Sequence, residues 1–291
     1  LHRYGIRTRE IGLNWAKADS RFDLSKEINE PNKVGYVVEI DPLNPNSTPK
    51  KHTALGRFKH ENAELVISKD GKIIVYMGDD ERGEYLYKYV SNESMNEVKD
   101  KSTLLSNGNL YVAKFNDNFT GEWLLLDTQT TGLSSKAEVC IFTRLAASKV
   151  GATTMDRPEW IASNPKKNEV CCCLTNNKNR GIKTNKGGDK VDVDKVNPRK
   201  NNKYGQIVRW KPRDNNHSSV YFEWDLFVVA GNPNVHDDNN RGSKNIDKEN
   251  MFNSPDGLKF DKYGRLWIQT DGNYSNSGDF KGMGNNQMLI A

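Results

Sequence analysis

Ser254-Pro-Asp-Gly-Leu-Lys-Phe-Asp-Lys-Tyr-Gly-Arg-Leu-Trp-Ile-Gln-Thr-Asp-Gly272 contains a pattern that recurs along the chain and indicates its architecture. Two apolar bursts, Leu258–Phe260 and Leu266–Gln269, flank Lys262-Tyr-Gly264, an order typical of a β-hairpin. Asp256 opens the stretch and Asp271 closes it. The pattern therefore predicts two antiparallel strands that carry acidic residues at one end.

Two earlier stretches show the same order of features. One begins at His60-Glu61-Asn62-Ala63, turns at Gly71 and ends at Val75-Tyr-Met-Gly-Asp79-Asp80. The other begins at Arg157-Pro158-Glu159-Trp160, turns at Pro165-Lys-Lys-Asn168 and ends at Asn176-Asn177. Glu61 and Glu159 are 98 residues apart, and Glu159 and Asp256 are 97 apart. Because a propeller blade takes about 40–50 residues, we expect two blades in each interval, with the acids on every second blade around one end of a channel.

The rest of the chain also favours short strands, because its apolar bursts are rich in Val, Ile, Tyr, Phe and Trp and are bounded by Gly, Asn, Asp or Pro. The further predicted strands are Gly35–Ile40, Leu65–Ile67, Ile73–Tyr76, Tyr85–Val90, Leu110–Phe115, Trp123–Leu126, Val139–Phe142, Val170–Leu174, Ile207–Trp210 and Val220–Val229. Leu145–Val150 is interpreted as one helical turn or a loop. We predict an all-β chain that forms a single, incomplete β-propeller domain over residues 1–291.

Composition excludes several classes of protein. The 291 residues carry a formal net charge of +5, and their mean hydropathy is −0.82. No apolar run approaches the ~20 residues of a membrane span, and the basic residues are interleaved with acids rather than forming a stripe. We therefore expect no membrane span and no nucleic-acid partner. No Cys-x-x-Cys spacing exists, so Cys171-Cys172-Cys173 is interpreted as small packing residues on alternate faces of a strand.

The repeated acids allow two interpretations. Three carboxylates held at one place repel one another unless a cation lies among them, which favours a metal cluster. Alternatively, they are ordinary turn acids, since Asp and Asn are common at the ends of hairpins. Spacing alone leaves both open.

Several longer blocks carry a resemblance to a known family. The blocks are Pro31–Pro42, Ala54–Ala63, Tyr76–Asp80 with Glu84–Lys88, Asp156–Trp160, Leu174–Asn177, Asn197–Arg199 with Tyr204-Gly205, and Ser254–Leu258 through Thr270–Gly272. In this order they resemble the PhoX-type alkaline phosphatases, a family of secreted bacterial phosphomonoesterases. The resemblance implies a six-bladed propeller in the full-length protein, iron(III) and calcium (Fe3+ and Ca2+) as cofactors at the mouth of the channel, and a periplasmic or secreted location.

The resemblance also implies roles for particular residues. Glu61 and Glu159 match metal ligands of the family, and Asp256, Asp271, Asp79 and Asp80 are further candidate ligands. Arg157 matches an arginine that grips phosphate, and a planar guanidinium suits two phosphoryl oxygens; the alternative is a structural salt bridge to Asp156 or Glu159. His60 and Asn62 are candidates to support the metal-bound carboxylates, although the sequence favours a hydrogen-bonded structural role for His60.

We therefore expect a metal-dependent hydrolase that releases inorganic phosphate from small-molecule phosphate monoesters and works as a monomer. Two alternatives remain from the residues alone: a calcium-dependent propeller hydrolase of the lactonase or phosphotriesterase kind, and a non-catalytic propeller that serves as a binding module. The family carries a Trp-Gly-Thr-Trp-Leu-Thr-Cys-Glu-Glu type of segment before the region where this sequence starts, and its last blade continues beyond position 291. The sequence is accordingly expected to be part of a longer protein.

Overall fold

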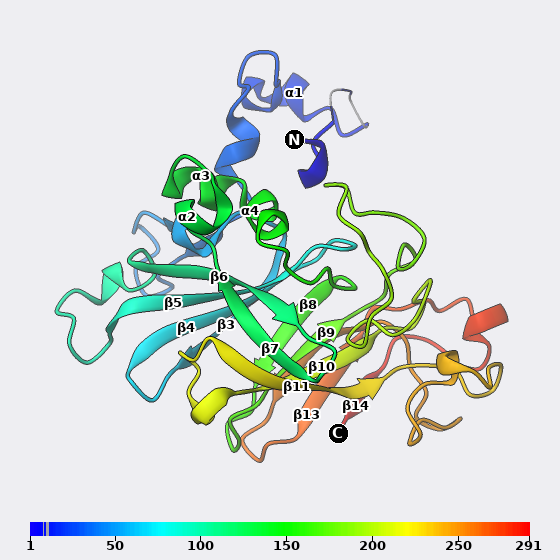
Figure 1. Cartoon of the computed structure of the whole chain (residues 1–291). Helices are drawn as coiled ribbons and strands as arrows, with labels where there is room; N and C mark the ends of the chain where they lie inside the picture. The colour runs from blue at the N-terminus through cyan, green and yellow to red at the C-terminus, as the bar shows by residue number, and fades with distance from the viewer. Residues whose placement is uncertain (8, 10–11) are drawn as a thin grey trace.

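Antiparallel strands form the framework of the structure, a computed structural model that describes residues 1–7, 9 and 12–291 (Figure 1). One large sheet has the strand order β3-β4-β5-β6-β7-β11-β10-β9-β8, a second has the order β12-β13-β14, and β1 pairs with β2. The strands are β1 (Val37–Glu39), β2 (Lys50–His52), β3 (His60–Ile67), β4 (Lys72–Asp79), β5 (Leu86–Ser94), β6 (Gly108–Phe115), β7 (Thr120–Leu125), β8 (Pro158–Ser163), β9 (Val170–Leu174), β10 (Gln206–Pro212), β11 (Tyr221–Val229), β12 (Pro255–Phe260), β13 (Leu266–Thr270) and β14 (Met288–Ile290).

The strands are arranged as blades of a propeller-like fold, which confirms the predicted all-β class. We call β3–β7 the first blade, β8–β11 the second and β12–β14 the third. Their first strands lie side by side, with β8 packed between β3 and β12. The first and second blades also meet at their outer edges, because β7 pairs with β11. The large sheet is therefore nearly closed, since its two end strands, β3 and β8, pack against each other.

The expectation of two blades per interval is wrong: Glu61, Glu159 and Asp256 lie on neighbouring blades. Each interval contains a single blade whose connections are long. Short helices follow β7 in the first blade, and residues 175–205 run between β9 and β10 in the second. Blade length in residues thus depends on loops that the strand pattern does not reveal.

Helices cover the outer face of the first blade (Figure 1). The α-helices are α1 (Trp15–Ala18), α2 (Thr128–Thr131), α3 (Lys136–Ile141) and α4 (Thr143–Lys149). Short 3₁₀ turns are η1 (His2–Tyr4), η2 (Ser20–Phe22), η3 (Glu30–Lys33), η4 (Thr53–Leu55), η5 (Lys101–Thr103), η6 (Arg213–Asn215), η7 (Asn239–Arg241) and η8 (Gly278–Phe280). None of the helices in the described part of the chain is long and apolar enough to cross a membrane.

The predicted strand Val139–Phe142 is wrong, because this burst lies mostly in α3. The Ser135 side chain accepts a hydrogen bond from the Glu138 amide and caps the helix N-terminus. Val139 then faces the first blade together with Ala146 and Ala147 of α4. A short apolar run fits either a strand or a buried helical turn, and here the cap decides in favour of the helix.

Apolar layers fill the spaces between blades. Tyr76 of β4 packs against Trp123 and Trp210 between the first and second blades. Between the second and third blades lie Cys171 and Cys173, whereas Cys172 faces the opposite layer. The three cysteines are buried on alternate faces of the strand, as predicted; they form no disulfide, and burial raises the pKa of each thiol. They are packing residues of a strand that is covered on both faces.

Candidate active site

The three repeated acids occupy the same irregularity in three equivalent strands. In β3, β8 and β12 the second and third residues both stand opposite a single residue of the partner strand, which is the arrangement of a β-bulge. In each case the acid is the first of the two bulged residues: Glu61, Glu159 and Asp256. A bulge re-aims a side chain at the end of a strand, so the repeat in the sequence corresponds to a repeated local geometry.

Gly78 brings the first two blades together at this level. It stands opposite the bulge of β3, and a Cβ at this position would lie 2.4 Å from the Pro158 carbonyl oxygen and 2.5 Å from that of Glu159. A backbone atom cannot move aside as the end of a side chain can, so only glycine permits this approach. The missing side chain therefore allows the start of β8 to lie directly against β4.

The acids of the three blades are close enough to influence one another. Burial raises the pKa of Glu61, and the carboxylates of Asp80, Asp256 and Asp271 raise it further. Burial and the adjacent Asp256 carboxyl raise the pKa of Glu159 well above its usual value. The structure thus gathers side chains that are distant in the sequence into one acidic cluster: Glu61, Asp80, Glu159, Asp256 and Asp271.

Arg157 lies within this acidic cluster. Its Nε and Nη2 atoms donate to the two carboxylate oxygens of Asp80, at 2.8 and 3.1 Å. Nη2 is also 3.2 Å from Oε1 of Glu159, and Nη1 donates to Oδ1 of Asn176 at 3.4 Å. The predicted salt bridge to Glu159 is present, whereas Asp156 pairs with Arg180 instead. Arg157 has φ = 57° and precedes a proline, a strained conformation of the kind found at functional sites.

Glu159 is the most deeply buried member of the cluster. It is 2% exposed, and its Oε2 atom has no hydrogen-bond partner. A buried polar atom without a partner costs free energy, and most such atoms in native proteins are satisfied by a protein group, a water or an ion. The position therefore suits a carboxylate oxygen that binds a cation.

Asp79 lies outside the cluster, although it neighbours Asp80 in the sequence. Its two oxygens accept hydrogen bonds from Nε and Nη2 of Arg144 at 2.7 and 2.6 Å, and both side chains are fully buried. The Lys59 amide donates to the same carboxylate. The predicted ligand role of Asp79 has no support in this geometry, because its oxygens are already occupied.

The hydrogen bonds of His60 and Asn62 go to backbone atoms rather than to the acids. The Nε2 atom of His60 bonds to the Gly56 carbonyl oxygen, and the ring stacks on Phe58 with centroids 3.7 Å apart. Burial lowers the pKa of His60 to about 4, so the ring is neutral near pH 7. Asn62 exchanges two hydrogen bonds with the backbone of Ile161 and so links β3 to β8. Both residues support the site through the backbone.

In the second blade, the residue equivalent to Asp80 and Asp271 lies one position earlier than the sequence pattern predicts. The residues that close the hairpins donate a backbone hydrogen bond to the residue before each inner strand: Asp80 to Lys59, Thr175 to Arg157, and Asp271 to Ser254. Thr175, not Asn176, is therefore the equivalent of the two aspartates. Asn176 instead contacts Arg157 and donates to Oγ of Ser254 at 3.1 Å. The sequence signal for this contact is that Asn176 directly follows Thr175, a position that the repeat contains in each blade.

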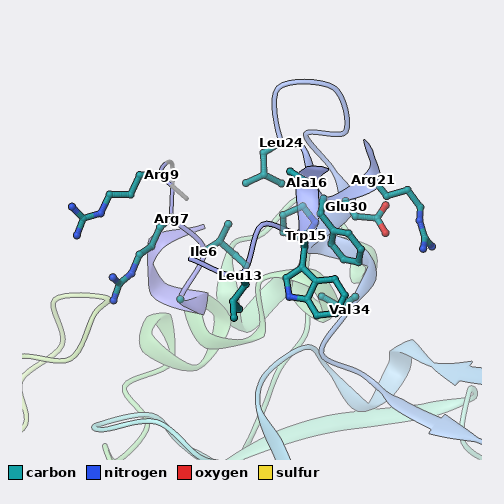
Figure 2. A pocket seen from close by; sticks show the side chains of 13 residues that line it. Ile6, Arg7, Arg9, Leu13, Trp15, Ala16, Arg21, Leu24, Glu30 and Val34 are labelled. Atoms are coloured by element: carbon teal, nitrogen blue, oxygen red, sulfur yellow. The ribbon is translucent and has the colours of Figure 1, made fainter. Parts of the chain in front are cut away.

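A cavity of about 360 Å³ lies elsewhere, at the N-terminal segment (Figure 2). Its walls include Ile6, Trp15 and Leu24, and the guanidinium groups of Arg7 and Arg21 extend away from these apolar side chains in Figure 2. None of the acidic cluster lines it. Its size does not make it the candidate active site, because it lacks the convergent charged groups that catalysis on a polar substrate requires.

The donor set fits a hard multivalent cation in its chemistry. The acidic cluster contains five carboxyl groups and Arg157, and one oxygen of Glu159 is buried without a partner. Among the described residues, however, His, Cys, Asp and Glu side chains form no group of three or more that could hold a metal ion. Arg157 currently occupies the oxygens of Asp80 and one oxygen of Glu159.

These features define the class of protein: a propeller-like β-fold whose neighbouring inner strands present carboxylates around one arginine. The chain belongs to the PhoX alkaline phosphatase family, since the family model described as "Alkaline phosphatase PhoX" matches residues 1–290. Membership of this family suggests metal cofactors.

A solved structure is similar over the whole chain. It is that of Pseudomonas fluorescens PhoX in complex with vanadate, a transition state analogue, which shares 52% sequence identity and superimposes with a TM-score of 0.93. The match covers 100% of this chain and 52% of that chain, so the chain spans about half the length of that relative. A search of curated proteins finds no match.

Proposed function

We propose that this protein is a metal-dependent phosphatase that releases inorganic phosphate from small-molecule phosphate monoesters. The observation that carries the proposal is the Arg157 guanidinium, one quarter exposed, among carboxylates of three neighbouring blades. Such a site can hold cations and a phosphoryl group next to each other. The similar Pseudomonas fluorescens protein binds vanadate as a transition state analogue, which supports the same chemistry here.

The metals that we propose are Ca²⁺ and Fe³⁺. Both are hard cations that prefer carboxylate oxygens. Glu61, Glu159, Asp256 and Asp271 are the residues that would hold them, with the unpartnered oxygen of Glu159 as the strongest candidate. When bound, such cations would activate the attacking oxygen and offset charge on the phosphoryl group.

Arg157 would bind and orient the phosphoryl group. Its Nε and one Nη2 hydrogen are committed to Asp80, so a ligand would approach the edge formed by Nη1 and Nη2, where Asn176 and Glu159 lie in this structure. Two parallel N–H donors on one planar edge match two phosphoryl oxygens. Glu159 now contacts this edge and would exchange Arg157 for a cation when the site is loaded.

A periplasmic or secreted location and a monomeric state complete the proposal. The location rests on the resemblance to secreted bacterial phosphatases. Fractionation of the native host and light scattering of the purified protein would test them.

The central experiment combines elemental analysis with turnover of p-nitrophenyl phosphate. The protein is expressed from its complete gene, and activity is measured with and without a chelator. We expect bound calcium and iron, hydrolysis, and loss of hydrolysis after chelation. Arg157→Ala should lower turnover by at least about 100-fold while leaving the metal content intact.

Other outcomes would redirect the assignment. One bound Ca²⁺ without iron would favour the propeller hydrolases of the lactonase or phosphotriesterase kind. Full metal content without hydrolysis of any phosphate ester would favour a binding module. An Arg157→Ala variant with a near-normal rate would remove this residue from the mechanism.

A further inference from the structure

The contacts of Arg157 divide its guanidinium into two edges. Asp80 accepts hydrogen bonds from Nε and Nη2, which form the side edge, at 2.8 and 3.1 Å. Such a two-point contact fixes both the position and the plane of the group. Both oxygens of Asp80 therefore bind Arg157 in this structure, whereas the sequence predicts that they bind a metal.

Asn176 holds the other end of the guanidinium. Its Oδ1 accepts from Nη1 of Arg157, and its Nδ2 donates to Oγ of Ser254. The second bond fixes the orientation of the amide, because Oδ1 must then face the arginine. Oγ of Ser254 in turn donates to Oδ1 of Asn253, and Ser254 is only 3% exposed. The arginine of the second blade is thereby tied to the first blade through Asp80 and to the third through Asn176.

The backbone conformation explains why such support is needed. Arg157 has φ = 57°, a left-handed backbone conformation that is strained for a residue with a side chain. A long arginine side chain also has many rotamers, and holding it in one of them lowers its entropy. Contacts at both ends of the guanidinium restrict these rotamers before a ligand arrives.

We propose that Asp80 and Asn176 position Arg157 for a phosphoryl ligand, and that Asp80 is not a metal ligand. The inference rests on the proposed function of the site, since it assigns the available edge of Arg157 to phosphate. It differs from that function in naming which residues create the edge.

The test compares Asp80→Asn and Asn176→Ala with wild type in the protein expressed from its complete gene. Elemental analysis measures the metals, calorimetric titration measures binding of inorganic phosphate, and p-nitrophenyl phosphate gives kcat and KM. We expect wild-type metal content in both variants. Phosphate binding and kcat/KM should each weaken by at least about tenfold in Asp80→Asn, the scale of a hydrogen bond to a charged group, and by less in Asn176→Ala.

Combining substitutions separates positioning from an independent role. In an Arg157→Ala background, Asp80→Asn should change phosphate binding by less than about twofold, because a positioning residue has nothing left to position. Glu81→Gln is the matched control: this neighbouring acid pairs with Lys59 and Lys186, and its substitution should leave phosphate binding unchanged. Loss of metal from Asp80→Asn, or multiplicative effects in the Arg157→Ala background, would overturn the proposal.

A crystal structure of Asp80→Asn tests the positioning of Arg157 without a measurement of activity. We expect the guanidinium to leave the position it holds beside Glu159. An unmoved guanidinium would overturn the inference even if the protein is an active phosphatase. Conversely, a displaced guanidinium in a protein that neither binds nor hydrolyses phosphate would support the positioning role and reject the proposed function.

Discussion

Asp79 and Asp80 are adjacent in the sequence, and each pairs with an arginine through both of its carboxylate oxygens, yet the two pairs lie in different environments. Asp79 and Arg144 are fully buried between the first blade and its helices. Asp80 and Arg157 are 21% and 25% exposed among the acids of neighbouring blades. The same chemical pair therefore serves as a fixed structural contact in one place and as an accessible polar site in the other.

The comparison indicates that burial, rather than the chemical identity of the pair, determines whether a salt bridge is a fixed structural contact or one that a ligand can replace. A charge left alone in the interior is strongly destabilising, whereas an exposed charge is solvated when its partner leaves. Arg157 can accordingly give up a carboxylate for a ligand at modest cost. Arg144 cannot do so without destabilising the fold.

The largest expected effect is that of Arg144→Ala. The substitution leaves the Asp79 carboxylate buried without its partner, and we expect a loss of about 3–5 kcal/mol in the free energy of unfolding. Arg157→Ala is the matched comparison and should cost less, because the Asp80 carboxylate that it leaves behind is 21% exposed. Urea unfolding of both variants measures the difference. Equal losses would refute the contrast between the two pairs.

Gly78→Ala tests the close approach of β8 to β4, which brings the first and second blades together at the site. The new methyl group would meet the backbone of Pro158 and Glu159, and we expect a loss of about 1–3 kcal/mol in stability as β8 shifts away from β4. Gly257→Ala is the control, because the atoms nearest its methyl group would belong to the Gln269 side chain, and the closest is the terminal Oε1 atom, which can move aside. Thermal melting should show a clear decrease for the first and a smaller one for the second. Similar melting temperatures would contradict the close approach at Gly78.

The smallest expected effect concerns Glu81, the next acid in the chain. Burial opposes its ionisation, but the ammonium groups of Lys186 and Lys59 outweigh burial and lower the pKa of Glu81 to about 2. The unfolded state therefore binds more protons between about pH 4.5 and pH 2. Stability from Glu81 is present above this range and is lost as the pH falls through it.

Glu81→Gln should consequently reduce the unfolding free energy at pH 7 by about 1 kcal/mol, a value discounted for the partly exposed lysines. The difference from wild type should shrink as the pH approaches 2. Glu27→Gln, which removes an exposed carboxylate, serves as the control and should change little. A difference that stays constant with pH would show that charge on Glu81 is not its cause.

Several features of the fold follow from local sequence. The hairpins at Gly71 and Gly264 were predicted because a short turn segment ending in glycine joins two apolar bursts in each. Both glycines have a positive φ, of 76° and 85°, which glycine adopts without strain. The strand Val170–Leu174 was predicted with the bounds observed. The burst at Val139 was misassigned, because four apolar residues do not distinguish a strand from a capped helical turn.

The candidate site was predictable only in part. Regular spacing of Glu61, Glu159 and Asp256 identified equivalent positions, and the structure places all three in equivalent bulges. Adjacency of the blades was missed, since it depends on loop lengths. The part played by Asn176 was also missed, because its two partners, Arg157 and Ser254, come from different blades.

Most of the strands, their turns and the repeated acids could be predicted from the sequence, because they depend on side-chain alternation and turn chemistry within a few residues. Sequence alone made Asp79 and Asp80 equivalent candidates for metal ligands. Which of the two enters the core and which faces the site became clear only from the folded structure. That choice depends on where Arg144 and Arg157 are placed by distant segments, and burial then fixes the energy of each pair.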